Sequence, residues 1–178
     1  VSEVNMEEIA KLADVKRTTV NYHYKTKELL NTEVLNFAVV KIVPPFEYLL
    51  NKRYSLEHSI YLFVVHYIDN LKEYPFLSTF IIYSINNNML HNSLLEKKIN
   101  LNKFYSKVRK RMANGTMAKM DEQYVLIFIL SLCSFPLSSK SLTKLSVGIS
   151  DESYEYYLIK QSDFVTNFVL RGLGLSEI

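Results

Sequence analysis

Apolar residues recur along most of the chain every three or four positions, the spacing that places them on one face of an α-helix. The pattern begins close to the first residue, where Ile9, Leu12 and Ala13 would share a face. Alternation of apolar and polar residues, typical of a half-buried strand, is almost absent. The sequence therefore predicts an all-α protein.

Caps, prolines and glycines divide this pattern into separate helices. Asn5 is a suitable N-cap residue, and the helix that it starts should end near Asp14. A longer helix should run from Lys25 until Pro44 and Pro45 end or kink it. The remaining predicted helices cover residues 55–73, 75–86, 92–112, 121–135 and 151–171.

The stretch after residue 135 is expected to be a break. Pro136 lacks a backbone donor, and the segment PLSSKS that it starts is rich in serine. A further break is expected at Gly115, and Gly172 with Gly174 forms a suitable stop for the final helix.

Composition limits the class of protein. Of the 178 residues 48% are apolar, with only four Gly and four Pro, which fits a compact helical unit or a small module fused to a larger one. The net charge of +3 is too small to bind nucleic acid through bulk charge, so any basic function must be local.

The single cysteine and the longest apolar run indicate the cellular compartment in which the protein is expected. Cys133 excludes a disulfide framework or a cysteine-rich zinc site, and we predict that it is a buried small hydrophobe. The longest apolar run, residues 124–135, is shorter than the ~20 residues that a membrane span needs. We therefore expect a cytoplasmic protein with no membrane partner.

The exception to the low charge lies between Val15 and Lys27, where thirteen residues include four cations and no acid. Ala10 falls where two helices of a helix-turn-helix cross closely, and Val15 and Val20 fall where apolar residues pack on either side of its turn. The residues left outside are donors and aromatics suited to phosphates and base edges: Lys16, Arg17, Thr18, Thr19, Asn21, Tyr22 and His23.

This segment resembles the helix-turn-helix of the tetracycline-repressor-like (TetR) family of bacterial transcription regulators, which typically reads IAxxAGVxxGTLYxHFxxKEEL. The corresponding letters here, from Ile9 to Leu30, are IAKLADVKRTTVNYHYKTKELL. Asp14 stands at the usual turn glycine, and Asp tolerates the left-handed conformation. Thr18 and Asn21 replace a frequent glycine and a frequent tyrosine.

The resemblance implies a helix-turn-helix DNA-binding domain over residues 1–30 and a larger helical domain over residues 31–178 that binds a ligand and dimerises. The family places one more helix before the motif, which about five residues precede here, so we expect the DNA-binding domain to be partial. The residues expected to contact DNA are Lys16, Arg17, Thr18, Thr19, Tyr22, His23 and Lys27.

In this family the larger domain surrounds a ligand cavity. The lining expected here combines aromatic rings with a few polar tips: Phe63, His66, Tyr67, Phe80, Tyr83, Asn87, Phe104, Tyr105 and Phe128. The helices at residues 121–135 and 151–171 are too apolar for one monomer to cover, and they should pair with their twofold mates. The residues expected at that interface are Tyr124, Phe128, Tyr157, Gln161, Phe164 and Phe168.

The sequence thus indicates a homodimeric regulator, by family default a repressor, that binds a palindromic operator on double-stranded DNA and responds to a small, mainly apolar effector. The main alternative is a helical small-molecule-binding protein whose helix-turn-helix no longer reads DNA, a reading that Asn21 keeps open. No Ser/His/Asp arrangement, carboxylate pair, metal-ligand spacing or phosphate-binding glycine loop is apparent, so we expect no catalytic residue, metal or cofactor.

A second basic run lies near residue 110. It could form another nucleic-acid patch, but cations in the last turns of a helix are ordinary surface that suits the helix dipole, and we favour that interpretation. We assign no function to its members, Lys107, Arg109, Lys110 and Arg111.

Overall fold

The computed structural model of the chain describes residues 4–87 and 99–176. All regular structure in these residues is helical, which confirms the predicted all-α class. The helices are α1 (Met6–Leu12), α2 (Arg17–His23), α3 (Lys27–Ile42), α4 (Phe46–Leu50), α5 (Leu56–Glu73), α6 (Leu77–Asn86), α8 (Asn102–Ala113), α9 (Glu122–Ser138), α10 (Lys140–Val147) and α11 (Asp151–Gly172).

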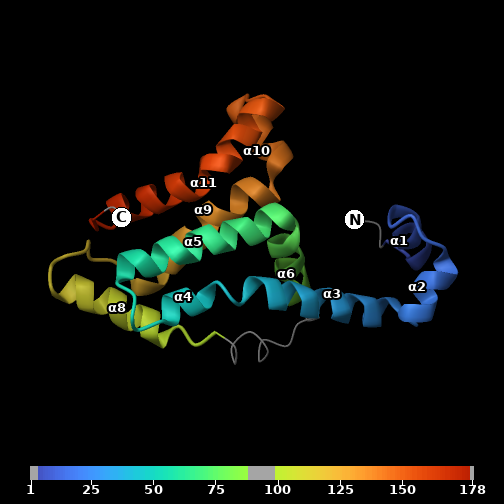
Figure 1. Ribbon diagram of the computed structural model, residues 1–178, viewed down its shortest axis with the longest axis horizontal. Coiled ribbons are helices and arrows are strands. Elements are labelled where there is room, and N and C mark those ends of the chain that lie inside the picture. The colour runs from blue at the N-terminus through green and yellow to red at the C-terminus, as the bar shows by residue number, and fades with distance from the viewer. Residues whose placement is uncertain (1–3, 88–98, 177–178) are drawn as a thin grey trace.

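Helix α5 is the centre of the molecule. It contacts α3, α4, α8, α9 and α11 (Figure 1). A helix covered from this many sides must be apolar around much of its circumference, and α5 meets that requirement. Its buried residues are Leu56, Ser59, Ile60, Phe63, Val64, Tyr67, Ile68 and Leu71.

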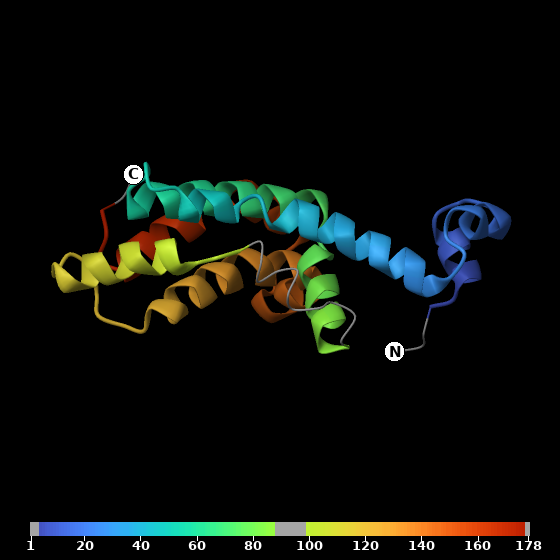
Figure 2. The same ribbon diagram turned by 90° about the horizontal axis from the view of Figure 1, so that it is seen from below.

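Helices α1 and α2 stand apart from this core. Figures 1 and 2 show them at one end of an elongated molecule, connected to the remaining helices through α3. The second half of α3 packs into the core with Leu35, Ala38, Val39 and Ile42, whereas residues 27–34 have no buried side chain. We call α1 and α2 the head, α3 the neck, and α4 to α11 the body.

Several predicted boundaries are confirmed. Asn5 caps α1, the chain turns at Asp14, and Gly115 breaks the chain after α8 with a φ of +70°. The last helix, α11, ends at Gly172. Of the helix predicted from residue 92, the structure describes only the part from Asn102, and the predicted start lies outside the described residues.

The two prolines end α3, as predicted, but they also introduce a short helix that the pattern did not predict. Pro45 is the N-cap of α4 and already has helical backbone angles, φ −54° and ψ −31°. A proline suits this place because the first residues of a helix have no intrahelical acceptor for their N–H groups.

The break expected in the segment that starts at Pro136 is present, but it lies at Ser139 and is a bend between two helices. Helix α9 continues through Pro136 to Ser138, and after a bend of 91° residues 140–147 form α10. A proline inside a helix removes the N–H that would reach the carbonyl four residues earlier, here that of Leu132. The side chain of Gln161 on α11 lies over this point, with its Nε2 3.1 Å from the Cys133 carbonyl oxygen and 3.5 Å from that of Leu132.

Gln161 is therefore a buried structural residue and not part of an exposed interface, which corrects the expectation from the sequence. It is 0% exposed within its own chain. Cys133, beside it, is buried as predicted, and burial raises the pKa of its thiol to about 12.

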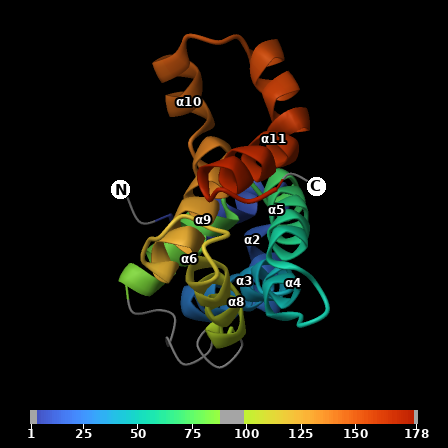
Figure 3. The same ribbon diagram turned by 90° about the vertical axis from the view of Figure 1, so that its left-hand side faces the viewer.

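Helix α10 and the start of α11 project together from the body (Figures 1 and 3). No residue of α10 is buried. Three ion pairs join these helices: Lys144 Nζ lies 2.8 Å from Asp151 Oδ1, and Lys140 Nζ lies 2.9 Å from Glu155 Oε1 and 3.7 Å from Asp151 Oδ1.

Within the described ranges, no single helix is long and apolar enough to cross a membrane. The bent pair α9 and α10 reaches the necessary length and composition only when its two helices are taken together.

The contact between Gln161 and the proline-containing turn predicts a non-additive effect on stability. Gln161→Leu should lower the free energy of unfolding by about 1 to 3 kcal/mol, because it leaves the Leu132 carbonyl, which has already lost its helical donor to Pro136, without a hydrogen-bond partner. In a Pro136→Ala background the loss of unfolding free energy should be smaller, because the backbone N–H of the new alanine can donate to the Leu132 carbonyl. Urea denaturation at fixed protein concentration measures both values.

Gln123→Leu, on the exposed start of α9, is the matched control and should change stability little. An equal loss for Gln161→Leu in both backgrounds would show that the amide does not compensate for the proline.

Candidate functional site

The head is built from two short helices and a tight turn. The Asn5 side chain accepts from the backbone N–H groups of Glu7 and Glu8, and the Glu8 carboxylate accepts from the Asn5 N–H, which completes a capping box. Asp14 has a φ of +53°, and the Val15 N–H donates to the Ala10 carbonyl at 3.0 Å. This left-handed residue reverses the chain so that α2 packs against α1.

The head has very little core of its own. Ala10 on α1 and Val20 on α2 are the only buried side chains from residue 4 to residue 34. Leu12 is 83% exposed and Val15 is 44% exposed, so apolar surface remains uncovered on the head. The predicted roles of Ala10 and Val20 at the helix crossing agree with their burial, whereas Val15 is not enclosed.

The residues expected to contact DNA lie on α2, just before it and at the start of α3, and most of them are exposed. Tyr22 is 81% exposed, and its ring meets that of His23 edge to face with centroids 5.2 Å apart. Lys27, the first residue of α3, is half-buried. The exposed members of the set are Lys16, Arg17, Thr18, Thr19, Tyr22 and His23.

Most of the positive charge in this segment is not neutralised. Arg17 Nη1 lies 3.2 Å from Glu7 Oε2, but both side chains are exposed, and such pairs are weak. No carboxylate in the described part of the chain pairs with Lys16, Lys25 or Lys27. These cations are therefore available to an anion from outside.

The start of α3 also favours negative charge. The Thr26 hydroxyl accepts from the Leu29 N–H at 3.3 Å, which leaves other amides of the first turn without a partner in the helix. Hydrogen bonds from the backbone N–H of Glu28, and then from Thr26, lower the pKa of the Glu28 carboxyl. An external phosphate would meet the same amides and dipole.

The nine residues expected to line a ligand pocket do not surround one cavity. Phe63 and Phe104 are 0% exposed and Tyr67 is 5% exposed, so these rings fill the core. The Phe63 ring lies 5.0 Å from that of Phe46 and 5.1 Å from that of Tyr67 between centroids. Side chains packed this closely leave no room for a ligand among them.

The other expected pocket residues are spread over the surface of the body. Phe80 and Tyr105 are half-buried at the edge of the core. Tyr83 is 53% exposed, and Asn87 is exposed at the end of α6, where its Nδ2 donates to the Tyr83 carbonyl. The last two, His66 and Phe128, each line a different cleft.

The cleft that includes His66 lies where α3, α4 and α5 meet and has a volume of about 570 Å³. The rings of Tyr48 and His66 stack nearly parallel, with centroids 4.6 Å apart and an interplanar angle of 9°. Asn70 Nδ2 donates to the Lys41 carbonyl at 2.8 Å and so ties the end of the neck to α5. The lining is Val40, Lys41, Pro44, Pro45, Glu47, Tyr48, Asn51, His66, Asp69 and Asn70.

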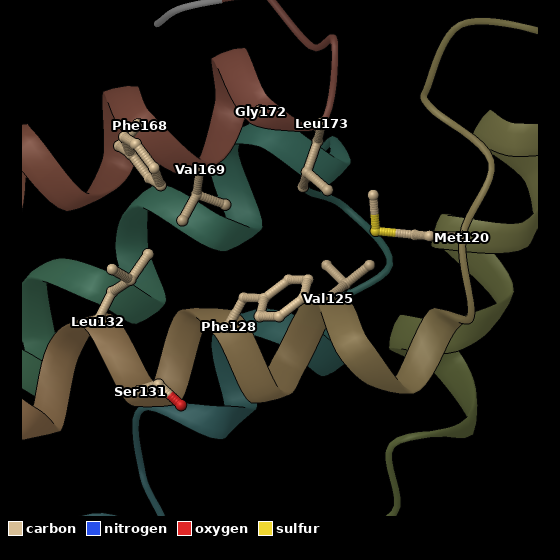
Figure 4. Close-up of a pocket in the computed structure, with 9 residues that line it drawn as sticks. All are labelled: Met120, Val125, Phe128, Ser131, Leu132, Phe168, Val169, Gly172 and Leu173. Carbon is tan, nitrogen blue, oxygen red and sulfur yellow. The ribbon is translucent and has the colours of Figure 1, made fainter.

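The cleft that includes Phe128 is an apolar groove of about 330 Å³ between α9 and α11. Figure 4 shows Phe168 and Val169 extending from α11 toward α9, with Val125 and Phe128 on the opposite side. Its lining is Met120, Val125, Phe128, Ser131, Leu132, Phe168, Val169, Gly172 and Leu173.

Two of the residues expected at a dimer interface, Phe128 and Phe168, line this groove, and most of the set is exposed. Phe164 and Phe168 are 55% and 68% exposed, Tyr124 and Phe128 are each 53% exposed, and Tyr157 is half-buried. Sequence reasoning missed Met120, because it lies before α9 and the apolar pattern of a helix does not show which loop residues border a groove.

No protein-family model matches the chain, and no curated protein matches it. Among the residues that the structure describes, no group of three or more His, Cys, Asp or Glu side chains could hold a metal ion.

Proposed function

We propose that the chain is a one-component transcription regulator of the tetracycline-repressor type. As a homodimer it binds a near-palindromic operator, acts as a repressor and responds to a small effector. The observation that carries the proposal is the outer face of α2. Helix α1 packs against α2, all residues of α2 except Val20 are exposed, and its surface combines cations, hydroxyls and exposed rings. The resemblance of residues 9–30 to the family's helix-turn-helix gives the same answer.

In this proposal α2 enters the major groove, which is wide enough for one helix. Arg17, Thr18 and Tyr22 face base edges, and Thr19, His23 and Lys27 bind phosphates. Arg17 must give up its ion pair with Glu7, but an exposed pair stabilises a protein by only about 0 to 1 kcal/mol. Because one head offers few contacts, two heads on two half-sites are needed for useful affinity.

The first functional prediction needs an operator sequence, which can be found by selecting the DNA duplexes that the protein binds from a random pool. Lys27→Ala should weaken binding to operator and to random DNA alike and lower the salt slope by about one unit, because a phosphate contact carries no sequence information. Arg17→Ala should relax sequence preference and lose about 1 to 3 kcal/mol at one base pair. Titration at several salt concentrations measures both effects.

Lys119→Ala, an exposed cation of the body, is the control and should change neither quantity. If Arg17→Ala weakens specific and random DNA equally, Arg17 only positions the protein. If the unaltered protein selects no sequence at all, the result favours the alternative, a helical small-molecule-binding protein that no longer reads DNA.

The homodimer is proposed to form through α9 and α11. Support comes from the exposed rings along both helices and from the apolar groove between them. Exposed apolar patches of this kind mark interaction sites, and a twofold axis would set the same patch against itself.

Charges in this surface should therefore separate the protomers. The double variant Phe128→Glu and Phe164→Glu should sediment as a monomer at micromolar concentration, since each carboxylate would be buried without a partner. Phe76→Glu alters a ring that is 75% exposed on another surface and should leave the dimer intact. A monomeric unaltered protein, or a dimeric double variant, would contradict the proposed interface.

We further propose that the effector is a small, mainly apolar molecule with a planar ring that binds in the cleft between α3, α4 and α5. The stacked rings of Tyr48 and His66 offer it a flat surface. The cleft includes Lys41 and Pro44 at the end of the neck, so an occupant contacts the helix that carries the head.

Compounds that bind the protein can be found because they raise its melting temperature, and these compounds then test the proposed site. An effector with a coupling free energy of about 1 to 3 kcal/mol should change operator affinity about 5- to 150-fold. His66→Ala should abolish the stabilisation by such a compound, whereas His58→Ala, outside the cleft, should not. A bound compound that leaves operator affinity unchanged rules out the sensor mechanism.

A further inference from the structure

A third cleft, of about 350 Å³, lies between the start of α5 and the end of α8. Figure 1 shows these helix ends at the end of the body away from the head. The cleft is distinctive because half of its lining residues are cations, contributed by two separate segments of the chain. The residues are Lys52, Tyr54, Ser55, Leu56, Lys107, Lys110, Arg111 and Asn114.

Lys107 is the most unusual member of this cleft. Its Nζ donates to the Asn51 carbonyl and to the Ser59 hydroxyl, both at 2.7 Å, and Ser59 itself is fully buried. Burial lowers the pKa of the Lys107 ammonium. Both acceptors are neutral, and an ammonium has three N–H donors, so one N–H is available to a further acceptor.

The other cations differ in how far they are neutralised. Arg111 pairs with Glu57. Burial alone would raise the pKa of Glu57, but hydrogen bonds from its backbone N–H, Ser55 and Arg111 hold it below its usual value, so Glu57 stays ionised beside Arg111. No described carboxylate pairs with Lys52, Lys107 or Lys110. Three positive charges around the cleft are therefore uncompensated.

Ordinary helix-end surface does not account for this arrangement. Lys110 alone would suit the C-terminal dipole of α8, and Arg109 is used in an ion pair with Glu122 on α9. Lys52, however, comes from the loop before α5, and Lys107 is drawn into the protein. Partly burying a cation without a counter-charge costs free energy, which an anion in the cleft would offset.

We propose that this cleft binds a small phosphate-bearing molecule. Lys52, Lys107 and Lys110 bind its phosphate oxygens, and the ring of Tyr54 borders the remainder of the ligand. The volume falls within the range of about 300 to 1,000 Å³ typical of small-molecule sites. The site is separate from the head, so the proposal does not rest on DNA binding.

Inorganic pyrophosphate is the probe, with calorimetric titration at constant ionic strength. We expect saturable binding of one pyrophosphate per chain. Lys110→Gln, which removes an exposed charge, should weaken it about twofold to fivefold. Lys107→Met, which keeps the apolar stem, should weaken it about tenfold or more, because a partly buried charge-assisted hydrogen bond is lost.

Lys103→Gln is the matched control, since Lys103 is an exposed cation on the same helix but outside the cleft, and it should have no effect. If Lys107→Met does not fold, as its thermal melting would show, Lys110→Gln decides the question alone, because it breaks no hydrogen bond within the described structure.

Three results would overturn the proposal. The first is the absence of saturable binding. The second is an equal loss for Lys103→Gln and Lys110→Gln, which would indicate bulk charge only. The third is binding to vesicles that contain phosphatidylserine without saturable binding of pyrophosphate, which would assign these cations to a membrane surface.

Discussion

The covering of α5 from several sides is the constraint on which the arrangement of the body depends. Its polar side chains are as important as its apolar ones. The Ser59 hydroxyl accepts a hydrogen bond from Lys107 of α8. The Tyr67 hydroxyl lies 3.3 Å from the Ser134 hydroxyl of α9. The Asn70 amide donates to the Lys41 carbonyl at the end of α3. Burial raises the pKa of the Tyr67 hydroxyl, so it remains a neutral hydrogen-bonding group.

These three contacts give the apolar packing a defined register. Apolar surface is non-directional, so helices that meet only through it can slide or rotate at small cost. These partly buried hydrogen bonds are lost if either helix shifts, and each lost bond costs about 0.5 to 1.5 kcal/mol. One polar residue of α5 thus fixes each of three neighbours, and the neck is one of them.

Features that depend on residues close in sequence could be predicted from the chain alone. The Asn5 cap, the turn at Asp14 and the stop at Gly115 were found because each follows from local backbone preferences. The outer face of α2 was found in the same way, since a seven-residue helix with one buried position leaves the rest of its surface exposed.

Features that depend on residues far apart in sequence could not be predicted. Pro136 signals a break, and only the amide of Gln161, 25 positions later, makes the continuation of α9 understandable. The predicted pocket failed to form around one cavity for a related reason. Aromatic residues such as Phe63 and Phe104 can line a cavity or fill it, and the choice depends on how closely distant helices approach.

The half-free helix α3 has a mechanical consequence. Residues 27–34, which have no buried side chain, extend about 12 Å from the packed half, so a tilt of about 10° where the two halves join would displace the start of α3 by about 2 Å. In the proposed twofold pair, both starts would move, and the distance between the two heads would change by up to about 4 Å. That exceeds the roughly 3.4 Å rise between successive base pairs. A small change of angle in the middle of α3, magnified along this lever arm, would put the two reading helices of the proposed dimer out of phase with their half-sites.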